Sequence, residues 1–431
     1  MIDPERIYTL SQAKVLLAKA INALDVKTKP TVFRLEIKIK PVNQIDWLAI
    51  QPGHIKIYGS NQDDSACIAG LGHAKTLAGK KADLNTLFKQ MRTFLSPQFP
   101  YLQWYGGLAF DKSDFRFVLP RFELARDGQK MMLACNLIGR INKQQVLREL
   151  IALKTTLKPL PLSLPSVVVR RDTPTQQKWH QSVQRVLNAI KLKQCQKVVL
   201  ARKTVFLFKE TINPWLIFAR LLRVTPDSYH FAFQFGNKVF LGASPERLFK
   251  RQSRALLTQA LAGSMSRGHE ARELLTSPKD RHEQGLVVDA MAKALLPLSQ
   301  HINYPKVPST ITLASGHHLN TDFNVILKDG INDEDVIESL HPTPALGGSP
   351  RHVALKFIKQ IESFKRGWYA GPVGYVGLDW AELVVGIRSG LVDGKTLAVY
   401  AGAGIVRGSD AASEWDEIEN KISNFYKIVI R

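Results

Sequence analysis

The sequence predicts an α+β fold in which mixed or antiparallel β-sheets are layered with helices. Three observations lead to this class. The strand-like runs occur in groups rather than in strict alternation with helices. Long helical patterns with clear N-terminal signals separate these groups. An apolar fraction of 45% with 22% charged residues is ordinary for a globular protein with a sizeable core.

Residues 1–165 alternate strand-like and helix-like stretches and form a first region. Its clearest element runs from Tyr101 to Asp111, where aromatic residues beside a Gly-Gly pair predict a strand entered through a tight turn. The proline-rich segment from Lys158 to Pro165 cannot continue a helix. We therefore expect it to link the first region to a second region, residues 173–431.

The second region opens with a helix, because apolar residues recur on one face at helical spacing. Strands follow where β-branched and aromatic residues gather. Three later helices are predicted, the first with Ser277 as its cap and Pro278 in its first turn. The first helix has Trp179, Val183, Leu187 and Ile190 on one face; the strands span Lys197–Phe208, Lys238–Phe249 and Ala255–Gly263; the later helices span Ser277–Leu296, start at Ser349-Pro350, and span Asp410–Ile430.

The net charge of +22 among 431 residues narrows the classes of function. Such a charge attracts anionic partners. The basic residues are spread along the chain, and the RNA-recognition, zinc-finger and basic-zipper signatures are missing, so no nucleic-acid partner is expected. A basic surface that attracts a dianionic metabolite fits this distribution, and a surface without a special role fits nearly as well.

The sequence also indicates where the protein works. Cys67, Cys135 and Cys195 are widely spaced and form no CxxC pair, so reduced and mostly buried thiols are expected. The first residues lack the basic start and apolar core of a signal peptide. No run approaches the roughly 18 apolar residues of a membrane span. A cytoplasmic protein is expected, with no membrane partner and as a monomer or homodimer.

Two predicted helices carry carboxylates beside their apolar faces. On the last helix, Glu414, Glu417 and Lys421 fall on one line next to the stripe that faces the core. On the helix from Ser277, Asp280 and Glu283 lie one turn apart. Such charges are either salt-bridged edge residues or site residues. Because no His or Cys accompanies them, a metal bound there would be a hard cation such as Mg²⁺.

Other residues that can carry chemistry lie on or beside the predicted strands. Lys197 shares a strand face with apolar neighbours, so it either reaches water or is buried as a possible base. Glu246 follows a proline at a strand end and either caps the next turn or acts as the matching acid. The stretch from Tyr400 to Gly408 is expected to be a loop whose glycines let backbone N–H groups converge on an anion.

Taken together, the second region resembles the chorismate-utilising enzymes, which include isochorismate, salicylate, anthranilate and aminodeoxychorismate synthases. The resemblance covers about residues 173–431, and the N-terminal part matches only loosely. It implies one large compact unit in which 1–165 pack onto a chorismate-binding catalytic domain. The matching segments, in the order of the family, are KVVLAR, GASPERL, ALAGS, KDRHE, HHL, LHPTPALGGSP, WYAG, GIRSG, YAGAGIVRGSD and EWDEIENK.

The resemblance also implies roles for individual residues. Glu283 and Glu417 are implied to bind Mg²⁺, with Asp280 and Glu414 acting through water or in another metal position. The base and acid are implied to be Lys197 and Glu246; Ser264 and His318 line the substrate ring, while Tyr369, Arg388, Gly402 and Gly404 hold the substrate carboxylates, and Lys421 contacts a carboxylate or the metal site.

This sequence departs from the family pattern in two places. Ser264 stands where many members have Thr, which keeps the hydroxyl, and Gln284 stands where His is frequent. Neither change removes a group that the chemistry needs.

The choice among the family's reactions depends mainly on Lys197. The amine-adding branches resemble one another in lacking this lysine and in reading PIAG or PIKG where this chain reads ALAG. The resemblance therefore implies water addition to chorismate, and no amidotransferase partner is expected. The terminal segments look most like isochorismate synthases of menaquinone biosynthesis. Salicylate formation, a siderophore-type isochorismate synthase and a catalytically inactive anion-binding homologue are the alternatives.

Overall fold

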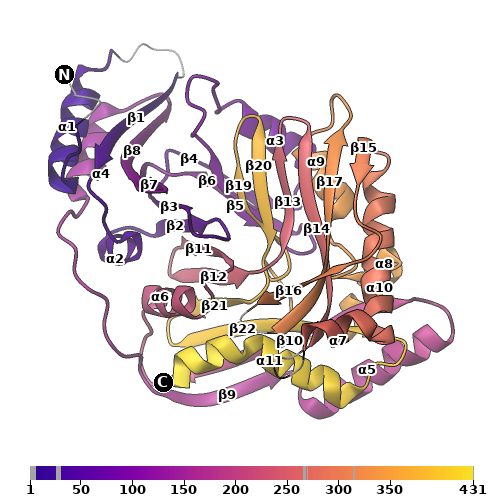
Figure 1. The fold of residues 1–431 in the computed structure, drawn as a ribbon. Helices are drawn as coiled ribbons and strands as arrows, with labels where there is room; N and C mark the ends of the chain where they lie inside the picture. The colour runs from indigo at the N-terminus through magenta and orange to yellow at the C-terminus, as the bar shows by residue number, and fades with distance from the viewer. Residues whose placement is uncertain (1–5, 26–30, 266–267, 269, 314–315, 431) are drawn as a thin grey trace.

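Two large antiparallel β-sheets, flanked by helices, form the protein (Figure 1). The computed structural model describes the chain except residues 1–5, 26–30, 266–267, 269, 314–315 and 431. Within the described residues, all pairings between named strands are antiparallel, whereas the sequence left mixed and antiparallel sheets open. The α+β class with layered sheets is therefore confirmed.

The first sheet is a long strip to which both regions of the chain contribute. The pairing of β2 with β11 joins the N-terminal strands to the later ones. The strand order is β1 (Thr31–Ile39), β8 (Lys130–Gly139), β7 (Phe122–Asp127), β3 (Ala66–Leu71), β2 (Ile55–Ser60), β11 (Tyr229–Phe235), β12 (Lys238–Ser244), β21 (Ser389–Asp393), β22 (Thr396–Val406), β10 (Lys197–Phe208) and β18 (Gly348–Ser349), and β9 (Val167–Thr173) also pairs with β10.

The second sheet is built in the same way. The pairing of β5 with β19 again joins strands from before residue 165 to strands from after it. The strand order is β15 (Ser299–Asn303), β17 (Gly316–Leu327), β14 (Ala255–Met265), β13 (Arg247–Gln252), β20 (Trp380–Val385), β19 (Pro372–Val376), β5 (Trp104–Leu108), β6 (Asp114–Leu119) and β4 (Lys75–Lys80), and β16 (Ser309–Leu313) also pairs with β17.

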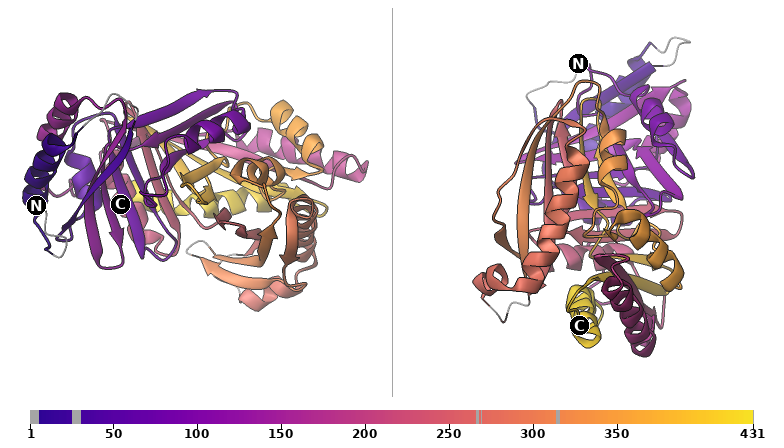
Figure 2. Two further views of the ribbon diagram at one scale, coloured as in Figure 1. Left: turned by 90° about the horizontal axis from the view of Figure 1, so that it is seen from above. Right: turned by 90° about the vertical axis from the view of Figure 1, so that its right-hand side faces the viewer.

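Helices cover the outer faces of the two sheets (Figure 2). The C-terminal helix packs on β22 and on two other helices, and the long helix after Ser277 packs on β14. The helices are α1 (Leu10–Ala23), α2 (Gln44–Ile50), α3 (Leu84–Arg92), α4 (Lys143–Ala152), α5 (Gln176–Lys191), α6 (Pro214–Val224), α7 (Ala271–Thr276), α8 (Pro278–Leu295), α9 (Asp333–Leu340), α10 (Arg351–Ile361) and α11 (Ala411–Ile430).

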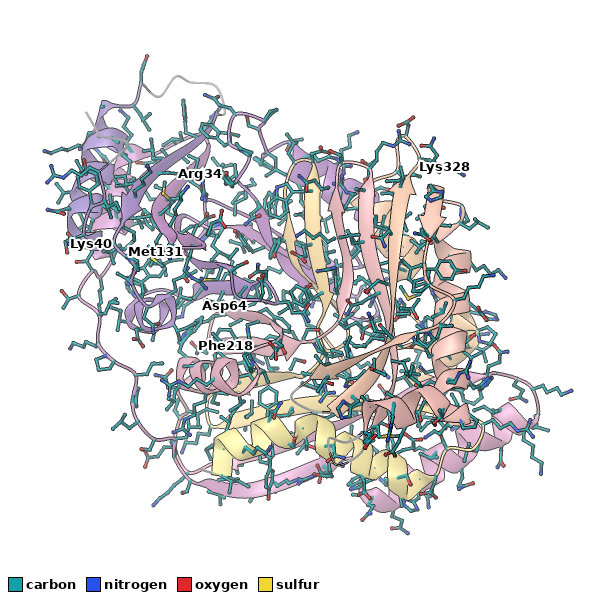
Figure 3. All side chains as sticks on the ribbon, in the orientation of Figure 1. Arg34, Lys40, Asp64, Met131, Phe218 and Lys328 are labelled. Carbon is teal, nitrogen blue, oxygen red and sulfur yellow. The ribbon has the colours of Figure 1, made fainter. Side chains whose placement is uncertain are left out.

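Buried side chains tie the N-terminal region to the rest of the chain. Phe218 of α6 packs edge-on against Tyr58 of β2, with 5.1 Å between the ring centroids (Figure 3). In the N-terminal part itself, the buried guanidinium of Arg34 donates hydrogen bonds to Glu123 and Asn136. One apolar core includes residues from both regions. The segment 158–165, expected to be a linker, contains neither helix nor strand.

Most of the predicted elements are found, and one expected strand is divided. The predicted strand Lys238–Phe249 is two strands, β12 in the first sheet and β13 in the second. Pro245 separates them because a proline has no N–H for the ladder. The chain therefore crosses between the sheets at Pro245 and Glu246, and this crossing puts Glu246 in the space where the two sheets meet.

The expectations about caps, thiols and membranes can be compared with the structure directly. The side chain of Ser277 caps α8, as predicted, by accepting a hydrogen bond from the backbone N–H of Asp280. Cys67, Cys135 and Cys195 are free and buried, as expected. In the described part of the chain, no helix is both long enough and apolar enough to cross a membrane.

Candidate active site

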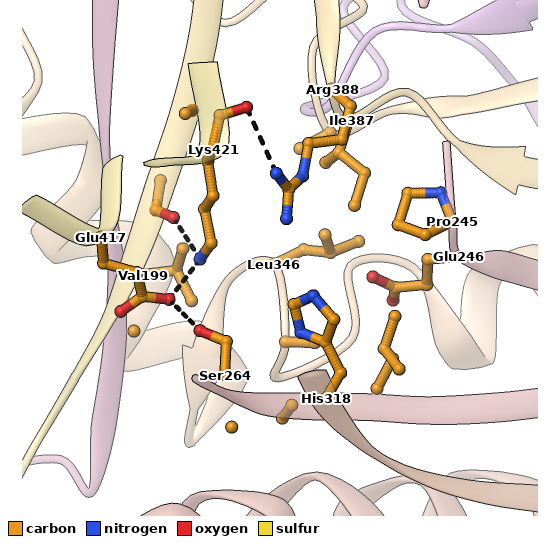
Figure 4. Close-up of a pocket in the computed structure, with 18 of the residues that line it drawn as sticks. Val199, Pro245, Glu246, Ser264, His318, Leu346, Ile387, Arg388, Glu417 and Lys421 are labelled. Atoms are coloured by element: carbon orange, nitrogen blue, oxygen red, sulfur yellow. Dashed lines mark hydrogen bonds and ion pairs between the residues drawn. The ribbon is translucent and has the colours of Figure 1, made fainter. Parts of the chain in front are cut away.

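A cleft opens where the two sheets come together beside α8 and α11 (Figure 4). Strands β10 and β22 supply one wall and β14 with β17 supply the facing wall. The turn that crosses between the sheets adds Pro245 and Glu246. Among the residues that line the cleft are Lys197, Glu246, Ser264, Glu283, His318, Tyr369, Arg388, Gly402, Gly404, Glu417 and Lys421.

The structure thus brings together all the site residues singled out from the sequence except Asp280 and Glu414, which lie just outside the cleft. Asp280 stands behind the β14 wall. A Cβ built on Gly263 of β14 would lie 3.0 Å from the Cβ of Asp280. Glu414 lines an adjoining groove that shares His318 and Glu417 with the cleft.

Lys197 and Glu246 are both buried and both face the cleft. The Nζ of Lys197 lies 2.8 Å from Oε1 of Glu283. The lysine therefore contacts a carboxylate as well as the apolar neighbours that the sequence predicted. Burial raises the pKa of Glu246 to about 8, although Lys197 and Lys421 both act to lower it. A carboxyl group with this pKa is mostly protonated at neutral pH and can donate a proton.

Arg388 and Lys421 both bring positive charge into the cleft, and Lys421 lies across the cleft from Glu246 (Figure 4). Arg388 donates a hydrogen bond to the backbone oxygen of Lys421 at 3.2 Å, and Lys421 Nζ donates to the backbone oxygen of Gly402 at 2.9 Å. Burial lowers the pKa of Arg388 to about 10, which leaves it charged at neutral pH. Two cations in one cleft favour a ligand with anionic groups.

His318 offers a neutral imidazole between these two sides (Figure 4). Burial, followed by the nearby charges of Arg388 and Lys421, lowers the pKa of His318 to about 3. Its Nε2 has no hydrogen-bond partner among the described residues. Nearby, Ser264 donates a hydrogen bond of 2.6 Å to Glu417. The imidazole nitrogen is therefore available to a polar group of a ligand.

The expectation of a glycine-rich loop at Tyr400–Gly408 was wrong for most of the segment, which belongs to strand β22. Gly402 pairs with Ala201 and Gly404 pairs with Val199 on β10. These glycines provide space. A Cβ on Gly404 would lie 2.5 Å from Glu283 Oε1 and 2.8 Å from Lys197 Cε, so only glycine leaves room for this ion pair.

Comparison with known proteins agrees with this geometry. The chorismate binding enzyme family model matches residues 18–430. The chain belongs to the chorismate-binding enzyme family. Isochorismate synthase 2, chloroplastic, from Arabidopsis thaliana is 32% identical, over 99% of this chain and 86% of that protein. The salicylate biosynthesis isochorismate synthase of Pseudomonas aeruginosa is 34% identical, over 74% of this chain and 72% of that protein.

A solved structure is similar over almost the whole chain. MenF, the menaquinone-specific isochorismate synthase from Escherichia coli, superposes with a TM-score of 0.89 at 30% identity. The alignment covers 97% of this chain and 99% of that one. The N-terminal region, which matched only loosely in sequence, is therefore part of the same fold as in other chorismate-binding enzymes.

Carboxylates of this chorismate-binding enzyme gather at the end of the cleft between α8 and α11. Each one is paired with a cation or a hydroxyl, since Lys421 lies 2.6 Å from Glu417 and Lys279 lies 2.7 Å from Glu414. The pKa of Glu414 is raised by burial and by the neighbouring Glu417. Burial and the charges of Glu283 and Glu417 are among the causes that raise the pKa of Asp280. The acids are thus close enough to repel one another.

This arrangement fits a magnesium ion. Among the described residues, no group of three His, Cys, Asp or Glu side chains is arranged to hold a metal. Mg²⁺ needs fewer protein ligands, because it binds through one or two carboxylates and keeps several waters or anionic ligand oxygens. Besides Glu246, the acidic side chains that line the cleft are those of Glu283 and Glu417. Oε2 of Glu414 is buried without a hydrogen-bond partner in the described part of the chain, as expected beside a cation site.

Sequence reasoning missed some residues that shape the cleft. Leu346 and Ala345 line it from the segment that reads LHPTPALGGSP, which was noted only as a family motif. Tyr400 stacks on Tyr369 with 5.4 Å between the ring centroids. Lys279 pairs with Glu414 across the two helices. All of these residues lie in segments noted as family motifs, with Lys279 at the start of KDRHE, but no sequence signal pointed to the contact of Lys279 with Glu414.

Proposed function

We propose that this protein is an isochorismate synthase that converts chorismate to isochorismate with the help of Mg²⁺. The observation that carries the proposal is the pairing of a buried lysine and a buried, protonated carboxyl group in one cleft with two cations. Lys197 and Glu246 both line the cleft, and so do Arg388 and Lys421. This combination provides a base, an acid and binding groups for a dianion. Family membership identifies the dianion as chorismate.

In the proposed reaction, water adds to C2 of the ring and the C4 hydroxyl departs. Lys197 accepts a proton from the attacking water as the C2–O bond forms, and the ring double bonds shift. Glu246, whose pKa is raised to about 8 by burial, donates its proton to the hydroxyl as the C4–O bond breaks. The C4 hydroxyl leaves as water, so one water is consumed and one is released, and the proton on Lys197 returns to Glu246 through solvent before the next turnover. Acid–base assistance of this kind contributes typically about 10²–10⁴-fold.

The remaining cleft residues bind and orient the ring. Arg388 and Lys421 attract the carboxylates, and Tyr369 is held in place by its stack on Tyr400. His318, neutral because burial lowers its pKa to about 3, turns its free Nε2 toward the cleft as a polar contact. Mg²⁺ held by Glu283 and Glu417 would supply a positive charge that binds the ring carboxylate.

We assign the product to menaquinone biosynthesis, because MenF from Escherichia coli matches over nearly its full length. The Pseudomonas aeruginosa relative, named for salicylate biosynthesis, is also an isochorismate synthase and supports the same reaction in a different pathway. The alternatives are pyruvate elimination to salicylate after isochorismate forms, isochorismate synthesis for siderophores, and an inactive anion-binding homologue. We also propose a cytoplasmic location, as for a metabolic enzyme with a diffusible substrate.

The test is incubation of the pure protein with chorismate, with and without Mg²⁺, followed by chromatography of the products. Isochorismate as the one product, formed only with Mg²⁺, is the expected result. Salicylate with pyruvate would replace the proposal by the salicylate synthase alternative. Binding of chorismate without turnover would support the inactive homologue. A product that needs ammonia would contradict the role given to Lys197.

A further inference from the structure

Strand β10, which carries Lys197, has a break along its outer edge. On that edge β18 pairs with Lys197 and Val198, and β9 pairs from Lys203 onward. Between these two short partners, no described strand pairs with the outer edge of residues 199–202. The backbone groups of this part of the cleft wall therefore need other partners.

Two side chains from the segment that directly follows α10 take the place of the missing strand. Oε1 of Glu362 accepts a hydrogen bond of 2.9 Å from the N–H of Ala201. Nη2 of Arg366 donates a hydrogen bond of 2.8 Å to the backbone oxygen of Val199. The two side chains are joined to each other by two hydrogen bonds, of 2.9 Å and 2.6 Å. They act on β10 as one unit.

The same guanidinium contacts two further segments that line the cleft. Nη1 of Arg366 donates a hydrogen bond of 2.9 Å to the backbone oxygen of Leu346. Its Cζ lies 5.9 Å from the ring centroid of Tyr369 and 4.3 Å from that of Phe110. Val199, Leu346 and Tyr369 all line the cleft, whereas Arg366 does not. One buried side chain thus joins three walls of the cleft from behind.

Satisfying buried backbone groups explains why a polar pair stands here, but it does not by itself explain the choice of a charged pair. The side chains of Arg366 and Glu362 are only 3% and 4% exposed. Taking two charges out of water costs free energy, and apolar replacements of buried ion pairs are often neutral or stabilising. An apolar pair, however, could not hold the oxygens of Val199 and Leu346 at fixed positions. The planar guanidinium, with its donors in a rigid fork, does so.

We infer that Arg366, oriented by Glu362, is a positioning residue that sets the geometry of Lys197 and Tyr369 across the cleft. The inference rests on the proposed isochorismate synthase activity. Arg366 holds β10 two residues from the base and holds the turn that bears Tyr369. Because a misplacement of about 1 Å can cost about 10²-fold in rate, a looser fit at Arg366 lowers kcat. Arg388 and Lys421, which attract the substrate carboxylates, are untouched, so KM changes less than kcat.

The experiment compares Arg366→Lys and Arg366→Ala with Arg251→Lys. Arg251 is the matched control, because it forms a buried ion pair with Asp333 and lies outside the cleft. Both lysine variants are expected to lose thermal stability to a similar degree. In Arg366→Lys we expect kcat to fall about 10–100-fold with KM changed less than threefold. Added guanidinium ion should restore part of kcat in Arg366→Ala.

A second measurement does not depend on turnover. The rate of acetylation of Lys197 is measured by mass spectrometry and divided by the rate at Lys279. This ratio reports the environment of the Lys197 amine. It is expected to change severalfold in Arg366→Lys and to stay at the wild-type rate in Arg251→Lys. Folded Arg366→Lys with wild-type kcat and wild-type labelling of Lys197 would overturn the inference. If the wild-type protein itself does not convert chorismate, the proposed function fails. In that case the positioning role is judged by the labelling alone, and unchanged labelling of Lys197 in Arg366→Lys would refute it.

Discussion

Substitution of Gly404 by alanine tests the cleft at its most crowded point. The added Cβ would lie 2.5 Å from Oε1 of Glu283 and 2.8 Å from Cε of Lys197. An ordinary van der Waals contact begins near 3.4 Å. Glu283 would therefore move by about 0.9 Å and Lys197 by about 0.6 Å to relieve the overlap. The proposed base and a proposed metal ligand are displaced together by one methyl group.

The size of the effect follows from these displacements. A shift approaching 1 Å at the reacting groups costs about 10²-fold in rate, which corresponds to about 2.7 kcal/mol of transition-state stabilisation. We expect kcat/KM of Gly404→Ala to fall by about this factor. We also expect a higher Mg²⁺ concentration for half-maximal rate, because Glu283 is a proposed ligand. Initial rates of isochorismate formation across a Mg²⁺ titration measure both.

Gly285→Ala is the control for this substitution. Gly285 lies on α8 two residues after Glu283, and a Cβ there meets nothing within 4 Å. Alanine is the better helix former by about 1 kcal/mol, so this variant should be slightly more stable and fully active. If Gly404→Ala retains a rate within threefold of the wild-type protein, the placement of Lys197 and Glu283 does not control the reaction.

Three further predictions follow from the same structure. Lys197→Ala should abolish isochorismate formation but keep Mg²⁺-dependent chorismate binding, measured by calorimetry; a normal rate would place the base elsewhere. Burial raises the pKa of Glu246 from 4.5 to about 8, so the free energy of unfolding decreases as pH rises from about 4.5 to about 8. Glu246→Gln should thus raise Tm more at pH 9 than at pH 5, and an equal effect at both would contradict this pKa. Arg251→Met leaves buried Asp333 unpaired, so chemical denaturation should show a loss of about 3–5 kcal/mol without a change in kcat of the folded protein.

The sequence predicted the elements that have strong local signals. Strand β10 was predicted with its observed bounds, because the β-branched and aromatic run from Lys197 to Phe208 is unambiguous. Helix α8 was predicted because Ser277 and Pro278 mark its start. The order of the motifs implied the family, which the comparisons confirm. These features depend on neighbouring residues in the chain or on a pattern of short segments.

Contacts between distant segments could not be predicted from the sequence. Pro245 was read as part of one strand, but its missing N–H and the competing second sheet turn the chain so that Glu246 enters the cleft. Gly404 was assigned to a loop, yet it is a strand residue whose lack of a side chain makes room for Lys197 and Glu283.

The sequence by itself determined the residue types and the local structure that this chemistry uses. The tertiary structure decided which of them meet. Glu283 faces Lys197, and Arg366 replaces a strand along β10, because helices packed on the sheets bring these side chains to strands distant in sequence. Local propensity carries no information about such contacts, since their free energy depends on the packing of whole elements.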